Sequence, residues 1–166
     1  MGCGKSSVGR LVASRLGCAF TDLDEAVEAA QGRSVARIFA EDGEADFRAA
    51  ELEALKDILS TSAPGTTVLA LGGGTLTMPE ARKLIAERTR CVYLRASVDT
   101  LVENLTMTGT ASRPLLEGAD NEAALRSRIE ALMAERSATY EEAADVIINI
   151  DGLSSEQIAE RAITVL

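Results

Sequence analysis

The strongest constraint on the fold is a short glycine-rich segment at the start of the chain. Gly4, Lys5 and Ser6 match the last three positions of the pattern G-x-x-x-x-G-K-[ST]. In loops of this kind, backbone N–H groups surround phosphate groups, the lysine contacts β- and γ-phosphate oxygens, and the serine hydroxyl ligates Mg²⁺. The segment predicts a nucleotide site, and its alternative is an ordinary glycine-rich turn. The residues expected to bind nucleotide are Gly2, Cys3, Gly4, Lys5, Ser6 and Ser7.

A helix is expected directly after this loop. Val8, Leu11 and Val12 recur at helical spacing, and Gly17 is suited to end the helix. The positive end of such a helix points at the bound anion. A loop of this type normally follows a buried central strand, and that strand and the loop's first glycine would lie before Met1. The sequence therefore predicts a sheet whose first strand is truncated.

Composition narrows the class of protein. The 166 residues suffice for a single domain with a proper core, and 46% of them are apolar, which argues against disorder. Only 3% are aromatic, so the core must be aliphatic. No apolar run could span a bilayer and no signal peptide is expected. Three scattered cysteines, Cys3, Cys18 and Cys91, fit a reducing cytoplasm and not a disulfide framework or a zinc site.

The absence of histidine and the net charge exclude further classes of protein. Without histidine, the chain can have neither a Ser-His-Asp or Cys-His catalytic arrangement nor a histidine-ligated metal. A net charge of −9 argues against general binding to nucleic acid. We expect a cytoplasmic monomer that acts on small molecules, with no nucleic-acid or membrane partner.

Strand and helix patterns alternate along the chain, which predicts a parallel α/β sheet. Short strands are expected at residues 18–23, 67–71, 91–94 and 145–150. Helices are expected at residues 25–31, 35–41, 44–59, 79–88, 98–107, 121–139 and from 154 onward. Their predicted capping residues are Thr77, Ser97, Asn121 and Ser154. Residues 108–120 are small, polar and rich in turn formers, which predicts a mobile loop.

Two carboxylates, Asp22 and Asp24, lie two residues apart at the end of the first expected strand. Their side chains should project toward the same side, at the carboxyl end of the strand where such sheets bind ligands. One acid can then order metal-bound water while the other accepts a proton from an attacking hydroxyl. The alternative for Asp24 is a role as the cap of the helix that follows.

Two arginines stand on the apolar stripes of expected helices. Arg48 lies four residues before Leu52 and seven before Leu55, and Arg136 lies four after Leu132. A guanidinium on a buried face needs an anionic partner, and its planar fork suits a carboxylate. The pair predicts a small acidic substrate, whereas the alternative for each is extension of the charge to solvent at a helix end.

Two loops add further candidates. Gly72, Gly73 and Gly74 follow an expected strand, where glycines permit close approach of the backbone to a ligand. Arg113 precedes Pro114 in the expected mobile loop and could move onto the phosphates as a lid arginine. The alternative for Arg113 is an ordinary solvated charge.

Taken together, these segments resemble shikimate kinase. The resemblance extends in order along essentially the whole chain, through the glycine-rich loop and residues 20–24, 38–48, 71–74, 112–116 and 134–140. It implies an α/β fold, a P-loop kinase three-layer sandwich whose parallel sheet has the strand order 2-3-1-4-5. Residues 1–166 would form a single domain, with substrate-binding helices at about 24–60 and a mobile lid at about 108–121. The implied reaction transfers the γ-phosphoryl of ATP to the 3-hydroxyl of shikimate, with Mg²⁺, in aromatic amino acid biosynthesis.

The resemblance also implies roles for individual residues. Ser6 and Asp22 would hold the metal, and Asp24 would bind shikimate hydroxyls and orient or deprotonate the nucleophile. The implied catalytic residues are Lys5, Asp24 and Arg113, and Arg113 would also contact the nucleotide. The implied substrate-binding residues are Asp24, Arg48, Gly72, Gly73, Gly74 and Arg136.

The sequence departs from the family pattern near the expected adenine site. Residues 104–112 contain no basic side chain, and residues 151–154 lack the arginine often found there in the family. Two other functions stay open. A related small-molecule kinase, such as one similar to gluconate kinase, would need fewer buried arginines for its neutral sugar. A non-catalytic nucleotide-binding protein would have no need to keep Lys5, Asp22 and Asp24.

Overall fold

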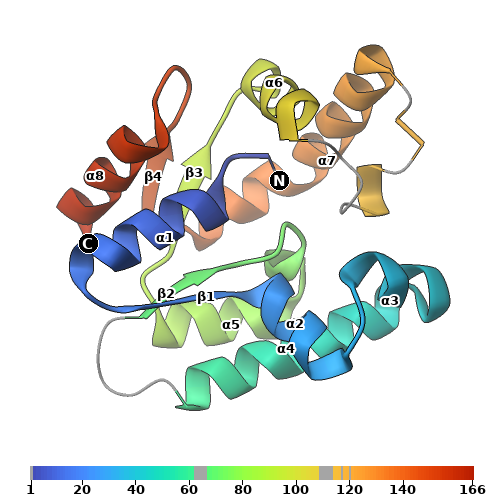
Figure 1. Cartoon of the computed structure of the whole chain (residues 1–166), viewed down its shortest axis with the longest axis horizontal. Coiled ribbons are helices and arrows are strands. Elements are labelled where there is room, and N and C mark those ends of the chain that lie inside the picture. Colours follow the sequence, from blue (N-terminus) through green and yellow to red (C-terminus); the bar gives the residue numbers. More distant parts are fainter. Residues whose placement is uncertain (1, 62–66, 109–113, 117, 120) are drawn as a thin grey trace.

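The computed structural model describes residues 2–61, 67–108, 114–116, 118–119 and 121–166. Within these ranges, α-helices and short strands alternate along the chain (Figure 1). The strands are β1 (Ala19–Asp22), β2 (Thr67–Ala70), β3 (Val92–Arg95) and β4 (Val146–Asn149). The helices are α1 (Lys5–Leu16), α2 (Leu23–Gln31), α3 (Val35–Glu41), α4 (Gly43–Thr61), α5 (Pro79–Arg88), α6 (Val98–Thr108), α7 (Glu122–Ala143) and α8 (Ser155–Val165), with 3₁₀ turns η1 (Thr75–Thr77) and η2 (Pro114–Leu116).

The strands form two parallel pairs. In the first pair, β1 runs beside β2 with Asp22 opposite Ala70. In the second, β3 runs beside β4 with Arg95 opposite Asn149. Both pairs are parallel, which confirms the predicted α/β class with parallel strands. Among the described strands, no ladder joins β2 to β3, so the two pairs do not form one continuous sheet. Figure 1 shows α1 lying between the two pairs in that view.

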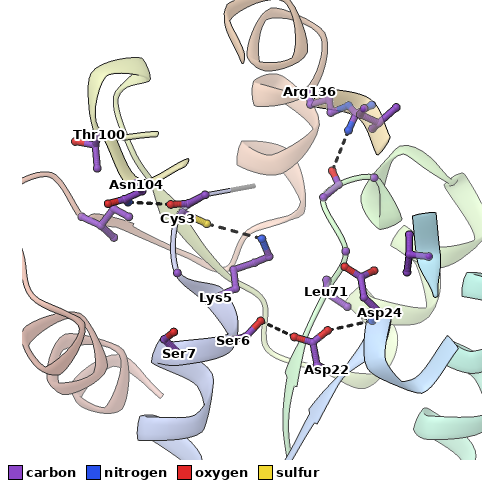
Figure 2. Close-up of a pocket in the computed structure, with 18 of the residues that line it drawn as sticks. Cys3, Lys5, Ser6, Ser7, Asp22, Asp24, Leu71, Thr100, Asn104 and Arg136 are labelled. Atoms are coloured by element: carbon purple, nitrogen blue, oxygen red, sulfur yellow. Dashed lines mark hydrogen bonds between the residues drawn. The ribbon is translucent and has the colours of Figure 1, made fainter. Parts of the chain in front are cut away.

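The parallel pairing brings the predicted site residues to one edge. Because Asp22 ends β1 opposite Ala70, which ends β2, the acidic segment after β1 and the glycine segment after β2 leave the sheet side by side. The amino end of α1 also faces this edge (Figure 2). Carboxyl ends of parallel strands are the usual ligand-binding edge of such folds.

The core is aliphatic, as the composition predicts. Its largest cluster joins α1, α6, α7 and α8 to β3 and β4, and two smaller clusters lie around β2, α4 and α5 and among α2, α3 and α4. Gly9 of α1 packs closely on the first strand pair, since a Cβ there would lie 2.6 Å from the Phe20 ring. A glycine at this position thus lets α1 approach the sheet closely.

Most predicted helix starts are confirmed, with one error. The side chains of Ser97 and Asn121 accept hydrogen bonds from the backbone amides of Thr100 and Ala124, as helix caps do. Ser154 caps α8 in a capping box. The prediction for Thr77 is wrong: it ends η1 and donates its hydroxyl to a backbone carbonyl, so α5 starts after it without a side-chain cap.

The helix lengths differ from the predictions at a few ends. α4 extends to Thr61, α7 continues to Ala143, and α2 begins at Leu23. Sequence patterns mark helix centres better than helix ends, because the last turn often contains no residue that packs in the core. Among the described residues, no helix has an apolar stretch long enough to cross a membrane.

Candidate active site

One cavity of about 640 Å³ lies at the edge where α1 begins and β1 and β2 end (Figure 2). It brings together every predicted site residue that the structure describes. These are Gly2, Cys3, Gly4, Lys5, Ser6, Ser7, Asp22, Asp24, Arg48, Gly72, Gly73, Gly74 and Arg136. The predicted lid arginine, Arg113, lies outside the described residues, as do residues 109–112, 117 and 120 of the predicted lid.

The glycine-rich loop presents the open end of a helix to this cavity. Gly4 precedes α1 with φ of 75°, in the left-handed region that favours glycine, and no side chain caps the helix. A Cβ on Gly4 would meet no other atom within 4 Å, so the loop is open on that side. The first amide groups of α1 are thus oriented as in helix ends that bind anions.

Lys5 carries the positive charge of this end of the cavity (Figure 2). Its Nζ lies 3.8 Å from the Cys3 sulfur. The charge of Cys3 raises the pKa of Lys5, burial opposes this, and Asp24 and Asp22 add to the increase. Lys5 therefore stays protonated at neutral pH, as contact with phosphate oxygens requires.

Asp22 links the loop to the first strand. Ser6 donates its hydroxyl to Asp22 Oδ2 at 2.5 Å, and the backbone amide of Asp24 donates to Asp22 Oδ1 at 3.0 Å. Asp22 is thus the cap of α2, so the alternative in which Asp24 caps a helix is wrong. The adjacent hydroxyl and carboxylate of Ser6 and Asp22 are oxygen donors of the kind that Mg²⁺ prefers.

Among the described residues, no group of three or more acidic or cysteine side chains could hold a metal ion by itself. A metal at Ser6 and Asp22 would therefore need further oxygen ligands from water or nucleotide phosphates, which is the usual mode for Mg²⁺ in kinases.

Asp24 does not cap a helix, and it lines the cavity. Burial raises the pKa of its carboxyl to about 6, with smaller increases from Asp22 and Glu51, while Lys5 and Arg48 act in the opposite direction. A carboxylate with a raised pKa in a cavity is suited to accept a proton from a hydroxyl group. Asp24 is the acid of the predicted pair that fits this role.

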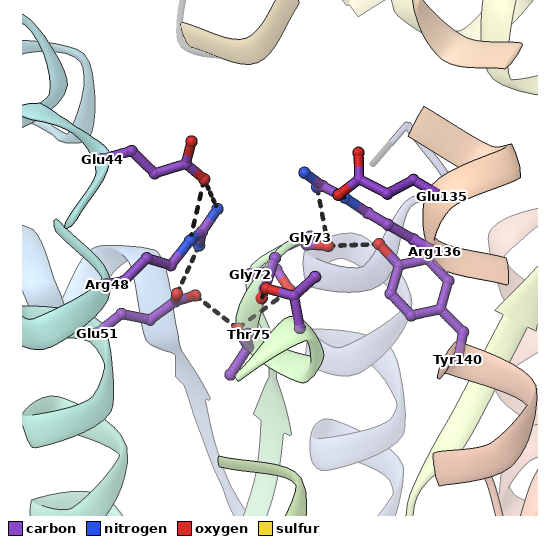
Figure 3. Close-up of polar contacts among 11 residues, drawn as sticks. Glu44, Arg48, Glu51, Gly72, Gly73, Thr75, Glu135, Arg136 and Tyr140 are labelled. Carbon is purple, nitrogen blue, oxygen red and sulfur yellow. Dashed lines mark hydrogen bonds and ion pairs between the residues drawn. The ribbon is translucent and has the colours of Figure 1, made fainter. Parts of the chain in front are cut away.

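Arg48 lies three residues before Glu51 and seven before Leu55, on the same face of α4, and its side chain is mostly buried. The buried residues of this helix are Phe47, Glu51 and Leu55, and the Arg48 side chain is 15% exposed. Its guanidinium pairs with Glu51 at 2.6 Å and with Glu44 at 3.0 Å (Figure 3). The anionic partners that sequence reasoning expected from a ligand are thus partly supplied by the chain.

Glu51 is a site residue that the sequence analysis missed. Its side chain is fully buried, and it accepts hydrogen bonds from Arg48 and from the Thr75 hydroxyl, the latter at 2.5 Å. Gly74 completes this arrangement, because a Cβ on it would lie 2.2 Å from Arg48 Nη2. The position of Glu51, four residues from both Phe47 and Leu55, could have identified it as buried.

Arg136 lies on the buried stripe of α7, as predicted, and is 5% exposed. Its Nη1 donates to the Gly73 carbonyl oxygen at 3.4 Å (Figure 3). Its Nε has no hydrogen-bond partner among the described residues, since Glu135 lies at 3.5 Å outside hydrogen-bond geometry. A buried guanidinium with an unused donor is an incomplete arrangement that ligand oxygens could complete.

The opposite wall of the cavity comes from α6 and the start of α8, which sequence reasoning did not nominate. It includes Thr100, Glu103, Asn104, Met107 and Ser155. Asn104 ties this wall to the glycine-rich loop by donating to the Gly2 carbonyl oxygen at 2.8 Å. None of these described side chains is basic, in agreement with the missing arginines noted in the sequence.

Comparison with known proteins identifies the family. A family model described as shikimate kinase matches the chain over residues 1–166. The chain belongs to the shikimate kinase family. Shikimate kinases from Streptomyces coelicolor and Halorhodospira halophila are each 40% identical to it. These alignments cover 98% and 100% of this chain, respectively, and 89% of each relative.

Solved structures of shikimate kinases share the fold. The shikimate kinase from Acinetobacter baumannii in complex with shikimate aligns with a TM-score of 0.90 at 30% identity, covering 99% of this chain and 87% of that one. The shikimate kinase from Aquifex aeolicus aligns with a TM-score of 0.78 at 28% identity, over 99% of this chain and 90% of the other. The family resemblance predicted from the sequence is therefore confirmed.

Proposed function

We propose that this chain transfers the γ-phosphoryl group of ATP to the 3-hydroxyl of shikimate, giving shikimate 3-phosphate and ADP. The observation that carries the proposal is the joint placement, in one cavity, of an uncapped helix end with Lys5 and of Asp24 with two arginines, Arg48 and Arg136. The first group suits phosphates and the second suits a small hydroxy acid. Family membership and the shikimate-bound relative support the same reaction.

On the nucleotide side, the amide groups at the start of α1 would bind phosphate oxygens, and Lys5 would neutralise charge on the transferred group. Ser6 and Asp22 would hold Mg²⁺, which supplies charge neutralisation on the phosphates when bound. The adenine base of ATP would lie against α6 and the start of α8. Arg113 would contact the phosphates from the lid, a role that stays a prediction.

On the substrate side, Arg48 and Arg136 would bind the shikimate carboxylate, with Gly72, Gly73 and Gly74 allowing the ligand close to the backbone. Asp24 would accept a hydrogen bond from the reacting hydroxyl and orient it toward the γ-phosphoryl group. As the phosphoryl group transfers, the hydroxyl proton would pass to the Asp24 carboxylate. Positioning of the two reactants accounts for most of the expected rate enhancement in phosphoryl transfer.

Glu51 would act through Arg48. Because it is fully buried and pairs with Nη1 of the guanidinium at 2.6 Å, it fixes one end of the fork. The hydrogen bond from Thr75 satisfies its other oxygen, so the buried charge is not left unpaired. This support would hold Arg48 ready before the substrate arrives.

A steady-state assay with a panel of substrates tests the proposed function. With ATP and Mg²⁺, the purified protein should release ADP rapidly when shikimate is added and slowly with gluconate, because gluconate is an open-chain acid without the ring hydroxyls that would face Asp24. Faster ADP release with gluconate would favour the related kinase. ATP binding without ADP release on any member of the panel would favour a non-catalytic nucleotide-binding protein.

We further propose that the complete sheet has five strands in the order 2-3-1-4-5. In this order β1, β2, β3 and β4 are strands 2, 3, 4 and 5, and strand 1 lies between β2 and β3. The absence of a ladder between the two described pairs supports this order. A crystal structure in which β2 and β3 bond directly to each other would contradict it. The single domain, the substrate-binding helices at 24–60, the lid at 108–121, the monomeric state and the cytoplasmic location also stay predictions.

A further inference from the structure

The glycine segment after β2 is held from two sides. On one side, the Thr75 hydroxyl joins it to Glu51 of α4. On the other side, the Tyr140 hydroxyl of α7 donates a hydrogen bond to the Gly73 carbonyl oxygen (Figure 3). Arg136 donates to the same oxygen at 3.4 Å. A single carbonyl group therefore receives both a tyrosine and one of the two arginines.

Tyr140 reaches this carbonyl from a well-packed base. Its ring lies 5.4 Å from the Tyr93 ring of β3 in a tilted arrangement, and it packs against the core cluster that contains Ile85 and Leu76. Burial raises the pKa of the Tyr140 hydroxyl, although Arg136 and Lys5 act against this. The hydroxyl therefore keeps its proton and stays a donor at neutral and mildly alkaline pH.

Arg136, by contrast, is held by few contacts, since its ion pair with the exposed Glu135 spans 3.5 Å without a hydrogen bond. Its bond to Gly73 is long, and its Nε has no hydrogen-bond partner among the described residues. The orientation of this guanidinium thus depends strongly on where the Gly73 carbonyl lies. Tyr140 is absent from the cavity lining, so it can influence a ligand only through the groups that it holds.

We propose that Tyr140 is a positioning residue for carboxylate binding, because its hydroxyl fixes the Gly73 carbonyl against which Arg136 is oriented. The same bond keeps the glycine segment in place beside Arg48, whose guanidinium lies where a Cβ of Gly74 would be. The inference rests on the proposed placement of the shikimate carboxylate between the two arginines. It adds a residue that does not touch the substrate but sets the geometry of one that does.

The test is the Tyr140→Phe variant, which removes the hydroxyl and keeps the ring. The KM for shikimate should rise roughly two- to tenfold, as expected for the loss of one neutral hydrogen bond. The kcat and the KM for ATP should change little, because Tyr140 contacts neither reacting group. The increase in KM should persist across neutral and mildly alkaline pH, since the hydroxyl does not ionise there.

Tyr93→Phe is the matched control. It removes the hydroxyl of the ring that packs against Tyr140 in a tilted arrangement, and that hydroxyl makes no hydrogen bond within the described part of the chain. The KM for shikimate should therefore stay at the wild-type value. An equal rise in KM in both variants would show that ring packing, and not the bond to Gly73, is responsible, and would overturn the inference.

A double mutant with Arg136 distinguishes failure of the inference about Tyr140 from failure of the proposed carboxylate placement. In an Arg136→Ala background, Tyr140→Phe should have little further effect on the KM for shikimate, because the group that it positions is gone. If Arg136→Ala raises this KM and Tyr140→Phe leaves it unchanged, the inference is wrong and the carboxylate placement stands. If Arg136→Ala itself has no effect, the placement is wrong and the inference fails with it.

Discussion

At the scale of single residues, the site divides between groups that the chain already satisfies and groups that it leaves incomplete. Arg48 pairs with two carboxylates of its own helix, whereas Arg136 has one long hydrogen bond and an unused donor. Asp24 is likewise not engaged as a cap and has a raised pKa. The groups without a full set of partners should change most when a ligand binds. Substitutions of these residues therefore give the clearest tests of substrate binding.

Arg136→Ala should raise the KM for shikimate far more than the KM for ATP. Loss of a charge-assisted hydrogen bond to a buried anion costs about 1.5–3 kcal/mol, which corresponds to roughly a tenfold to hundredfold change. Arg136→Lys should recover only part of this, because the planar fork is lost. Steady-state kinetics with each substrate varied in turn measures the effect.

Arg48→Ala should act in the same direction but with a second consequence. It leaves the buried Glu51 carboxylate without its cation, so the melting temperature should fall as well. Equal changes in the KM for both substrates in the Arg136 variants would contradict carboxylate binding and indicate a structural role for these arginines.

The pH dependence tests Asp24. If its ionised form accepts the hydroxyl proton, kcat/KM should be lost as the pH falls through about 6, where this carboxyl becomes protonated. Asp24→Asn should abolish most of the activity at all pH values. Asp22→Asn should move the acidic limb of the profile to lower pH, because the charge of Asp22 is one cause of the raised pKa.

Stability supplies an independent measure of the same pKa. A carboxyl whose pKa is raised on folding contributes its cost above that pKa, so Asp24→Asn should increase the melting temperature at pH values above about 6. The difference should disappear as the pH falls below the ordinary pKa of aspartate. A limb near the ordinary pKa in the rate profile, with no gain in stability, would contradict this assignment.

At the scale of elements, local patterns predicted what local sequence determines. The glycine-rich loop, the stripe that contains Arg136 and the caps Asn121 and Ser154 were readable because each depends on residues close in sequence. Tyr140 was missed because its partner, Gly73, lies 67 residues away on another element. Glu51 could have been identified as buried from its spacing on α4, but its bond to Thr75, 24 residues away, could not. The sequence did not show that Asp22, and not Asp24, caps α2, because an aspartate at either position satisfies the same capping rule.

Gly74→Ala tests how closely one element is fitted to another. The backbone at Gly74 has φ of −110°, so alanine is not strained there, but its Cβ would lie 2.2 Å from the Arg48 guanidinium. The variant should displace Arg48 and raise the KM for shikimate without changing that for ATP. In an Arg48→Ala background the same substitution should add little, and a large additional effect would contradict the proposed clash.

At the scale of the whole molecule, the site is assembled from parts that share no strand pairing. Arg48 comes from α4, which packs with α2, α3 and α5, and Arg136 comes from α7, which packs with α6. The alternation of patterns predicted the parallel α/β class, since βαβ connections follow from it. Alternation alone does not predict that the described strands form two separate pairs, because pairing between strands depends on contacts that no local pattern records. Two pairs are what the order 2-3-1-4-5, implied by the family resemblance, would give for these four strands.

If the proposed function is right, this one cavity holds ATP phosphates and a small hydroxy acid together for transfer to a defined hydroxyl. The most direct measurement is identification of the product by ³¹P and ¹H NMR after reaction of the protein with ATP and shikimate. We expect a single phosphate ester on the 3-hydroxyl, formed in equal amount to ADP and lost in Asp24→Asn. Release of ADP with inorganic phosphate in place of an ester, or an ester on another hydroxyl, would contradict it.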